Sequence, residues 1–392
     1  MKITHIHIER FRGFQNEDFE VGSLLTAIAG QNGTQKSTLL GIITQTFTLK
    51  TEDSMRVEKP LCGGSYISAF KDKFRLSPTF DKPKGHEWTI SFDAGMDDFT
   101  VESIKRTGDP NVRFWKKGAR QEGDGYISFP TIFLSLKRLV PVAEEAKIIT
   151  DDTLLTQEEL NEFKQLHNKI LIAQTPISSA TTITSKNKQS IGVSTELYDW
   201  NQNSMGQDNL GKIILALFSF KRLHDKYPRQ YKGGILAIDE MDATMYPASQ
   251  VELLKVLRKY ASKLNLQILF TTHSMSLLKA MDDLVQEVTK KEETANQAKI
   301  LYLKKVDDKI AIKQGVNFKG IQLDLNVVAE GNNRKKNRIT AYTEDKENIL
   351  FVKAILKSKA FVLDFVDVTL PCSTLMEKVF FKNRSKSIRF SH

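Results

Sequence analysis

Cysteine is scarce in this chain of 392 residues. The two cysteines, Cys62 and Cys372, lie far apart and have neither the number that a disulfide framework needs nor the spacing of zinc ligands. The sequence has no apolar run long enough to cross a bilayer, and residues 1–10 alternate like a strand, without the continuous apolar core of a signal peptide. These absences favour a cytoplasmic protein with no membrane partner.

The composition is that of a globular protein, with 40% hydrophobic and 27% charged residues. A chain of this length has room for two or three domains, each with its own core. The net charge of +10 favours an anionic partner such as nucleic acid, although a solvated lysine surface gives the same balance.

A phosphate-binding loop is predicted at residues 30–38, which read GQNGTQKST and follow the apolar run 24–29. A glycine loop between a strand and a helix directs backbone N–H groups at one spot, where Lys36 adds positive charge and the Ser37 hydroxyl can ligate Mg²⁺. Gln35 stands where the pattern G-x-x-x-x-G-K-[ST] has its second glycine. A left-handed backbone there would cost about 1–2 kcal/mol, which is small beside a domain stability of about 5–15 kcal/mol. We therefore expect ATP binding with slow turnover.

The middle of the chain divides into several predicted segments. Short alternating pieces over residues 50–130 predict a peripheral antiparallel sheet. The apolar run 130–136 predicts a core strand, and the cations after it, Lys137 and Arg138, either lie near a nucleotide or belong to a solvated loop. Residues 150–192 are expected to form a helical insert, which begins at a capping box, and a polar linker over 175–192. Sustained heptads are absent, which excludes a long coiled-coil arm.

From residue 193 onward, predicted helices alternate with buried strands. Helical patterns cover 210–223 and 251–264, and continuous apolar strands cover 233–238 and 266–272. This alternation predicts an α/β fold with a doubly wound parallel sheet, whose ligand lies at the carboxyl ends of the strands.

Polar residues follow both of these strands. Asp239 and Glu240 end the first, where Asp239 would hold Mg²⁺ and Glu240 would orient and deprotonate an attacking water. His273 ends the second and can hydrogen-bond a γ-phosphate or the attacking water. The segment 203–209 opens the next helix either as a phosphate-binding surface or as a plain N-cap.

Together these motifs resemble the ABC-type ATPase heads of the SMC, RecF and Rad50 class. The opening IERFRGF (8–14) resembles its first strand and turn, residues 30–37 resemble its G-x-N-G-x-G-K-[ST] loop except at Gln35, and 203–207 resemble its L-S-G-G-Q signature. The resemblance implies ATP and Mg²⁺ as cofactors and a homodimer, or a higher oligomer, that sandwiches ATP. It implies catalytic roles for Lys36, Glu240 and His273, ATP binding by Gly30, Asn32, Gly33, Lys36, Ser37 and Thr38, Mg²⁺ ligation by Ser37 and Asp239, a D-loop acid at Asp242, and a signature acting in trans through Ser204, Gly206 and Gln207.

The chain is expected to divide into an ATPase domain over 1–330 and a short C-terminal α/β unit over 337–392. The pattern of strand, acid, helix and strand in the second part resembles the opening of a Toprim nuclease domain, as fused to ATPase heads in OLD-family proteins. Glu344 would be its first metal-binding acid. A later Asp-x-Asp strand is missing from the sequence, so we expect an incomplete, truncated Toprim unit, or else a small accessory cap in which Glu344 only begins a helix.

Three functions follow from these expectations. The leading hypothesis is an ATP-hydrolysing head that acts on or senses nucleic acid within an OLD-like anti-phage defence nuclease, with a retron reverse transcriptase and its msDNA as candidate partners. The second is a non-nucleolytic ATP-dependent clamp or scaffold for a separate effector. The third is a RecF-like DNA repair ATPase.

Overall fold

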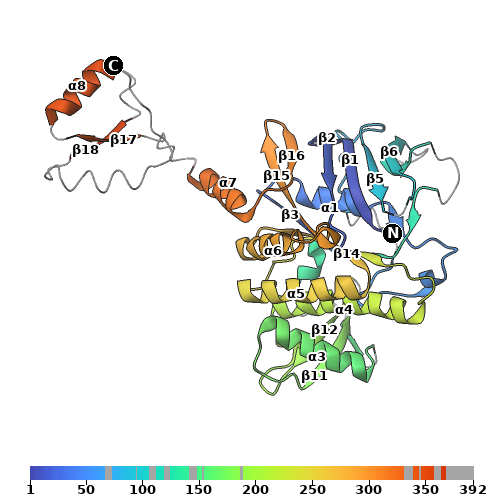
Figure 1. The fold of residues 1–392 in the computed structure, drawn as a ribbon. Helices are drawn as coiled ribbons and strands as arrows, with labels where there is room; N and C mark the ends of the chain where they lie inside the picture. Colours follow the sequence, from blue (N-terminus) through green and yellow to red (C-terminus); the bar gives the residue numbers. More distant parts are fainter. Residues whose placement is uncertain are drawn as a thin grey trace. The chain divides into compact units, whose positions relative to one another are not determined.

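The computed structural model describes residues 1–66, 73–93, 95–105, 112–118, 124–140, 148–151, 154–185, 189–330, 339–343, 346–356 and 363–367. The chain forms two compact units, Met1–Gln322 and Leu323–His392 (Figure 1). None of the helices within the described ranges combines the length and the apolar character that a membrane span requires.

A six-stranded sheet forms the centre of the first unit (Figure 1). Its strands lie in the order β16-β15-β3-β14-β13-β9. The strands β15, β3, β14, β13 and β9 run parallel, and β16 pairs antiparallel with β15 at the edge. Every residue of β3, β13 and β14 is buried, which explains their continuous apolar sequence. The bounds are β3 Leu25–Gly30, β9 Thr131–Leu134, β13 Gly234–Ile238, β14 Leu266–Thr272, β15 Ala298–Val306 and β16 Lys309–Lys313.

A second, antiparallel sheet has the order β2-β1-β5-β6-β7. Its strands are β1 Ile3–Phe11, β2 Phe14–Glu20, β5 Glu87–Phe92, β6 Phe99–Lys105 and β7 Val112–Lys116. The predicted peripheral sheet is thus present, and it also includes the two N-terminal strands. Short strands β4 (Phe47–Thr48) and β8 (Ile127–Ser128) pair separately.

Helix α1 (Lys36–Thr44) joins the two sheets into one core. Leu39, Leu40 and Ile43 of this helix cluster with Trp88 of the antiparallel sheet and Leu269 of the central sheet. Burial of such side chains contributes about 1.5–3 kcal/mol each, so this core fixes the helix that follows the phosphate loop.

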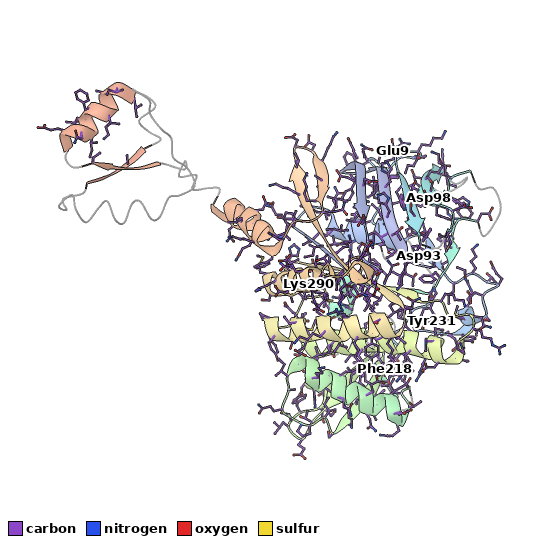
Figure 2. All side chains as sticks on the ribbon, in the orientation of Figure 1. Glu9, Asp93, Asp98, Phe218, Tyr231 and Lys290 are labelled. Carbon is purple, nitrogen blue, oxygen red and sulfur yellow. The ribbon has the colours of Figure 1, made fainter. Side chains whose placement is uncertain are left out.

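The other face of the central sheet carries helices. α5 (Pro247–Lys263) contacts β14, and α6 (Met275–Val288) contacts β15. Phe218 of helix α4 (Met205–Lys226) is fully buried. Glu9 and Asp98, which Figure 2 also labels, are exposed. Helix α3 (Gln157–Leu171) contacts both α4 and α5, and it begins at the predicted capping box.

The linker expected over residues 175–192 is wrong. β11 (Ser179–Thr184) and β12 (Gln189–Ser194) form an antiparallel pair, and β10 (Ile149–Asp151) adds to β11. β12 contacts α4, where Ile191 and Val193 are buried. The Ser, Thr and Asn content of the segment suggested a linker, but alternation with a few apolar residues is enough for a strand that packs on a helix.

The second unit begins within α7 (Phe318–Glu330) and contains β17 (Ile339–Thr343), α8 (Lys346–Leu356) and β18 (Leu363–Asp367). β17 and β18 are parallel, so the described residues form a βαβ unit, as the pattern predicted. Glu344 and residues 368–392 lie outside the described residues.

Candidate functional site

Three strands of the central sheet end at the same edge. The register pairs Ala29 of β3 with Thr272 of β14, and Ile238 of β13 with Phe270 of β14. The loop after β3, the acids after β13 and His273 after β14 therefore meet at the carboxyl ends of parallel strands. The sequence alone indicated such a site, because each of these segments follows an apolar run.

The loop between β3 and α1 has the shape of an anion cradle. Gly30 has a φ of 152°, and a Cβ there would lie 2.4 Å from the carbonyl oxygen of Leu303, so only glycine fits. The Lys36 ammonium donates to the carbonyl oxygens of Gly30 at 3.1 Å and Gln31 at 3.0 Å, which closes the loop on itself. α1 begins without a side-chain cap, so its first N–H groups remain available to an anion.

Gln35 adopts the left-handed conformation, with φ 62° and ψ 32°. This residue therefore carries the strain of about 1–2 kcal/mol that a side chain has in that conformation. Its side chain lies against the β1–β2 turn, where a Cβ on Gly13 would be 2.9 Å from Gln35 Nε2, and its Oε1 is buried without a hydrogen-bond partner.

Asp239 lies between two hydroxyl groups. Ser37 Oγ donates to Asp239 Oδ1 at 2.8 Å, and Thr271 Oγ1 donates to the same oxygen at 2.7 Å. Asp239 is 5% exposed. A serine hydroxyl beside a carboxylate is an oxygen pair that suits Mg²⁺, which usually takes its remaining ligands from water and phosphates. The described residues contain no group of three or more His, Cys, Asp or Glu side chains arranged for a metal.

The residues after Asp239 form a strained turn. Glu240 is left-handed, with a φ of 49°, a conformation that costs a non-glycine residue about 1–2 kcal/mol. Its N–H donates to Thr271 Oγ1 at 2.6 Å. The carboxylate of Asp242 accepts the N–H of His273 at 3.3 Å, so this turn and the end of β14 are tied together.

A lysine ammonium and three carboxylates lie near one another at this edge of the sheet. Burial lowers the pKa of Lys36, and the carboxylates of Glu240, Asp239 and Asp242 oppose that change. Burial and the nearby Lys36 ammonium lower the pKa of His273, which keeps its imidazole neutral at pH 7. A neutral imidazole offers both a donor and an acceptor at this edge.

The segment around Ser204 forms the N-terminus of α4. Ser204 Oγ accepts the N–H of Gln207 at 3.3 Å, and Gln207 Oε1 accepts the N–H of Ser204 at 2.9 Å, a complete capping box. A Cβ on Gly206 would lie 2.6 Å from the Thr244 carbonyl oxygen, so the helix start touches the turn after β13. The capping box binds the serine and glutamine to each other, and Ser204 itself is exposed.

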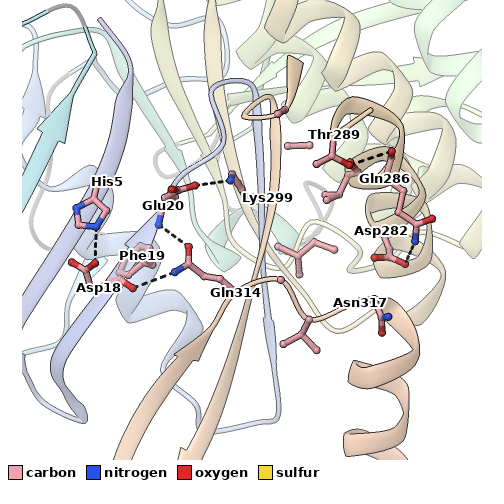
Figure 3. A pocket seen from close by; sticks show the side chains of 16 residues that line it. His5, Asp18, Phe19, Glu20, Asp282, Gln286, Thr289, Lys299, Gln314 and Asn317 are labelled. Carbon is pink, nitrogen blue, oxygen red and sulfur yellow. Dashed lines mark hydrogen bonds and ion pairs between the residues drawn. The ribbon is translucent and has the colours of Figure 1, made fainter. Parts of the chain in front are cut away.

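A separate groove of about 760 Å³ lies between β2, α6 and β15 (Figure 3). Several of its polar groups are paired, because Lys299 contacts Glu20 at 2.6 Å and Gln314 bonds the backbone of both Asp18 and Glu20. It contains none of the residues predicted for the nucleotide site.

The fold and this edge define a mixed α/β domain of the P-loop type. Residues 135–278 match the family model of an AAA ATPase domain, a range that includes the α4 start, Asp239, Glu240 and His273. No curated protein matches the chain.

Three solved structures of SMC heads are similar in fold. The SMC head domain from Thermotoga maritima is 14% identical, with a TM-score of 0.44 over 81% of this chain and 100% of that one. An SMC head bound to the C-winged helix domain of ScpA is 13% identical, with a TM-score of 0.47 over 82% and 100%. A head with an extended coiled coil, bound to the C-terminal domain of ScpA derived from Pyrococcus furiosus, is 13% identical, with a TM-score of 0.45 over 84% and 99%.

Sequence reasoning missed two residues of this edge and left a third undecided. The Thr271 hydroxyl donates to the Asp239 carboxylate and accepts the Glu240 N–H, and the Asn209 amide of α4 donates to the turn after β13. Arg138 is not in a solvated loop, since it is 2% exposed, and it donates to the Glu240 carbonyl oxygen at 2.8 Å, beside the predicted site. Polar residues inside otherwise apolar runs, such as the threonine pair at 271–272, are the signal that could have revealed them.

Proposed function

We propose that this chain is a Mg²⁺-dependent ATPase of the ABC-type head class. The observation that carries the proposal is the convergence of the loop with Lys36, the acids Asp239 and Glu240, and His273 at one edge of the sheet. The ATPase-domain match over residues 135–278 supports the same activity.

Each residue has a role that its surroundings support. The loop residues Gly30, Asn32, Gly33, Lys36, Ser37 and Thr38 bind the phosphates, because they surround the uncapped start of α1. Ser37 and Asp239 hold Mg²⁺, which when bound neutralises the developing phosphate charge. Glu240 orients the attacking water, and His273, whose lowered pKa favours the neutral imidazole, hydrogen-bonds that water.

The proposal includes a homodimer. The start of α4, with Ser204, Gly206 and Gln207, binds the γ-phosphate held by a second subunit, which the exposure of Ser204 permits. Asp242 then acts as the D-loop acid beside that composite site.

The decisive experiment compares Glu240→Gln with a surface control, Glu293→Gln. We expect Glu240→Gln to bind ATP and lose at least about 100-fold in kcat, and the control to match the native protein. Full hydrolysis by Glu240→Gln would overturn the assignment.

A second experiment tests the homodimer. A mixture of Lys36→Ala and Ser204→Arg subunits, each inactive alone, should regain part of the activity if the signature acts in trans.

The wider role we propose is an OLD-like defence nuclease that acts on nucleic acid, supported by the net charge of +10 and by the βαβ unit over 339–367. Mg²⁺-dependent DNA cleavage that disappears in Glu344→Ala, while ATP hydrolysis continues, would support it. If this chain cleaves no DNA with any metal, a clamp or scaffold for a separate effector is favoured instead. A strong preference for DNA gaps or junctions would favour a RecF-like repair ATPase.

A further inference from the structure

Arg138 is a buried cation that the proposed ATPase roles leave unexplained. It lies in the short 3-10 helix Leu136–Leu139 that follows β9, and it is 2% exposed. Its described hydrogen-bond partners are all uncharged oxygens: the carbonyl oxygens of Leu134, Ser135 and Glu240, and the side chain of Asn209. The carboxylates of Asp239, Glu240 and Asp242 are near enough to offset part of the cost of burying this charge, but none of the described hydrogen bonds joins them to the guanidinium.

The partners of Arg138 connect it to the proposed catalytic glutamate. Arg138 Nη2 donates to the Glu240 carbonyl oxygen at 2.8 Å, while the Glu240 N–H donates to Thr271 Oγ1 at 2.6 Å. The peptide groups on both sides of Glu240 are therefore held. Because Glu240 has a φ of 49°, these bonds retain a conformation that the residue would otherwise leave.

The same guanidinium reaches the start of α4. Arg138 Nε donates to Asn209 Oδ1 at 2.7 Å, and Asn209 Nδ2 donates to the Ala243 carbonyl oxygen at 2.9 Å. Asn209 is fully buried on the helix that Ser204 caps. One continuous chain of hydrogen bonds thus joins the helix of the signature segment to the turn that carries Glu240.

We propose that Arg138 is a positioning residue that holds Glu240 in its strained backbone conformation and, through Asn209, couples the position of α4 to that of Glu240 in the same subunit. The inference rests on the proposed ATP hydrolysis. It implies that a phosphate bound at the α4 start of one subunit is sensed by the Glu240 of that subunit, so the two ATP sites of a dimer respond to each other.

The test uses the full chain with Arg138→Met, Arg138→Lys and Asn209→Ala, and Lys259→Met on the exposed side of α5 as the control. We expect Arg138→Met and Asn209→Ala to lose about tenfold or more in kcat, with the ATP Kd and KM within about twofold of native. Arg138→Lys should recover part of the kcat, and Lys259→Met should equal the native protein. Hydrogen exchange in residues 239–246 should quicken in Arg138→Met and Asn209→Ala.

Equal kcat in native protein, Arg138→Lys and Asn209→Ala would overturn the inference, as would a loss that appears in KM or Kd alone. If Arg138→Met does not fold, the other two variants decide the question. If the native protein hydrolyses no ATP, the proposed function fails, and the exchange measurement alone then decides whether Arg138 holds the 239–246 turn.

Discussion

Replacing Gln35 by glycine and by alanine separates the backbone strain of the phosphate loop from the contribution of the side chain. Gln35 is left-handed, and its amide oxygen is buried without a partner. Both variants remove the amide and its contact with the β1–β2 turn. Only Gln35→Gly also removes the Cβ that makes the left-handed conformation unfavourable.

The magnitude follows from two opposing terms. Relief of the left-handed strain contributes about 1–2 kcal/mol, and the extra freedom of glycine in the unfolded chain costs about 0.5–1 kcal/mol. The two ranges leave a difference of about 0–1.5 kcal/mol, so we expect Gln35→Gly to be more stable than Gln35→Ala by about 0.75 kcal/mol, the difference of the midpoints.

Urea unfolding followed by tryptophan fluorescence measures this difference, since Trp88, Trp115 and Trp200 all lie in the unit Met1–Gln322. Equal stability of the two variants, or a more stable Gln35→Ala, would refute the reasoning. The same samples test turnover: we expect native protein to bind ATP and hydrolyse it slowly, and Gln35→Gly to have an equal or higher kcat.

Three further predictions concern neighbouring elements. Gly206→Ala should destabilise the chain by about 1–3 kcal/mol in urea, because its Cβ would lie 2.6 Å from the Thr244 carbonyl oxygen, and unchanged or increased stability would contradict that contact. Thr271→Val should lower kcat and should also lower the free energy of unfolding by about 1–3 kcal/mol, because the hydroxyl bonds both Asp239 and the Glu240 N–H. Thr271→Ser should restore both quantities. Native kcat and stability in Thr271→Val would show that the hydroxyl is dispensable. Burial lowers the pKa of His167 to about 4, whereas an unfolded histidine has a pKa of about 6.5. Between these values the unfolded state binds a proton that the folded state does not, so about 2 kcal/mol of stability should be lost between pH 7 and pH 5. That loss should be absent from urea titrations of His167→Phe, and an equally steep fall in the variant would count against the assignment.

In the C-terminal unit, the sequence pattern predicted secondary structure but not chemistry. Apolar spacing predicted a strand, helix and strand after residue 338, and β17, α8 and β18 are present. The predicted metal-binding role of Glu344 stays a prediction, because Glu344 lies outside the described residues, and the resemblance to Toprim stays a proposal.

The sequence by itself determined the elements whose signals are local. The glycine loop, the apolar runs that end in Asp239 and His273, the capping box at Thr156 and the helix start near Ser204 are all readable in short windows. Helix and strand periods and caps depend on neighbouring residues. Since parallel strands end at one edge, the meeting of these segments also followed from the α/β alternation.

Only the tertiary structure decided which distant groups meet. It placed β15 beside β3 within the central sheet, turned the expected linker into the β11–β12 pair, and set Thr271 between Asp239 and Glu240. It also buried Arg138 against Glu240 and Asn209, a contact across 102 positions of the chain on one side and 71 on the other. Strand pairing and buried polar contacts depend on three-dimensional neighbours, and no local pattern in the sequence records those.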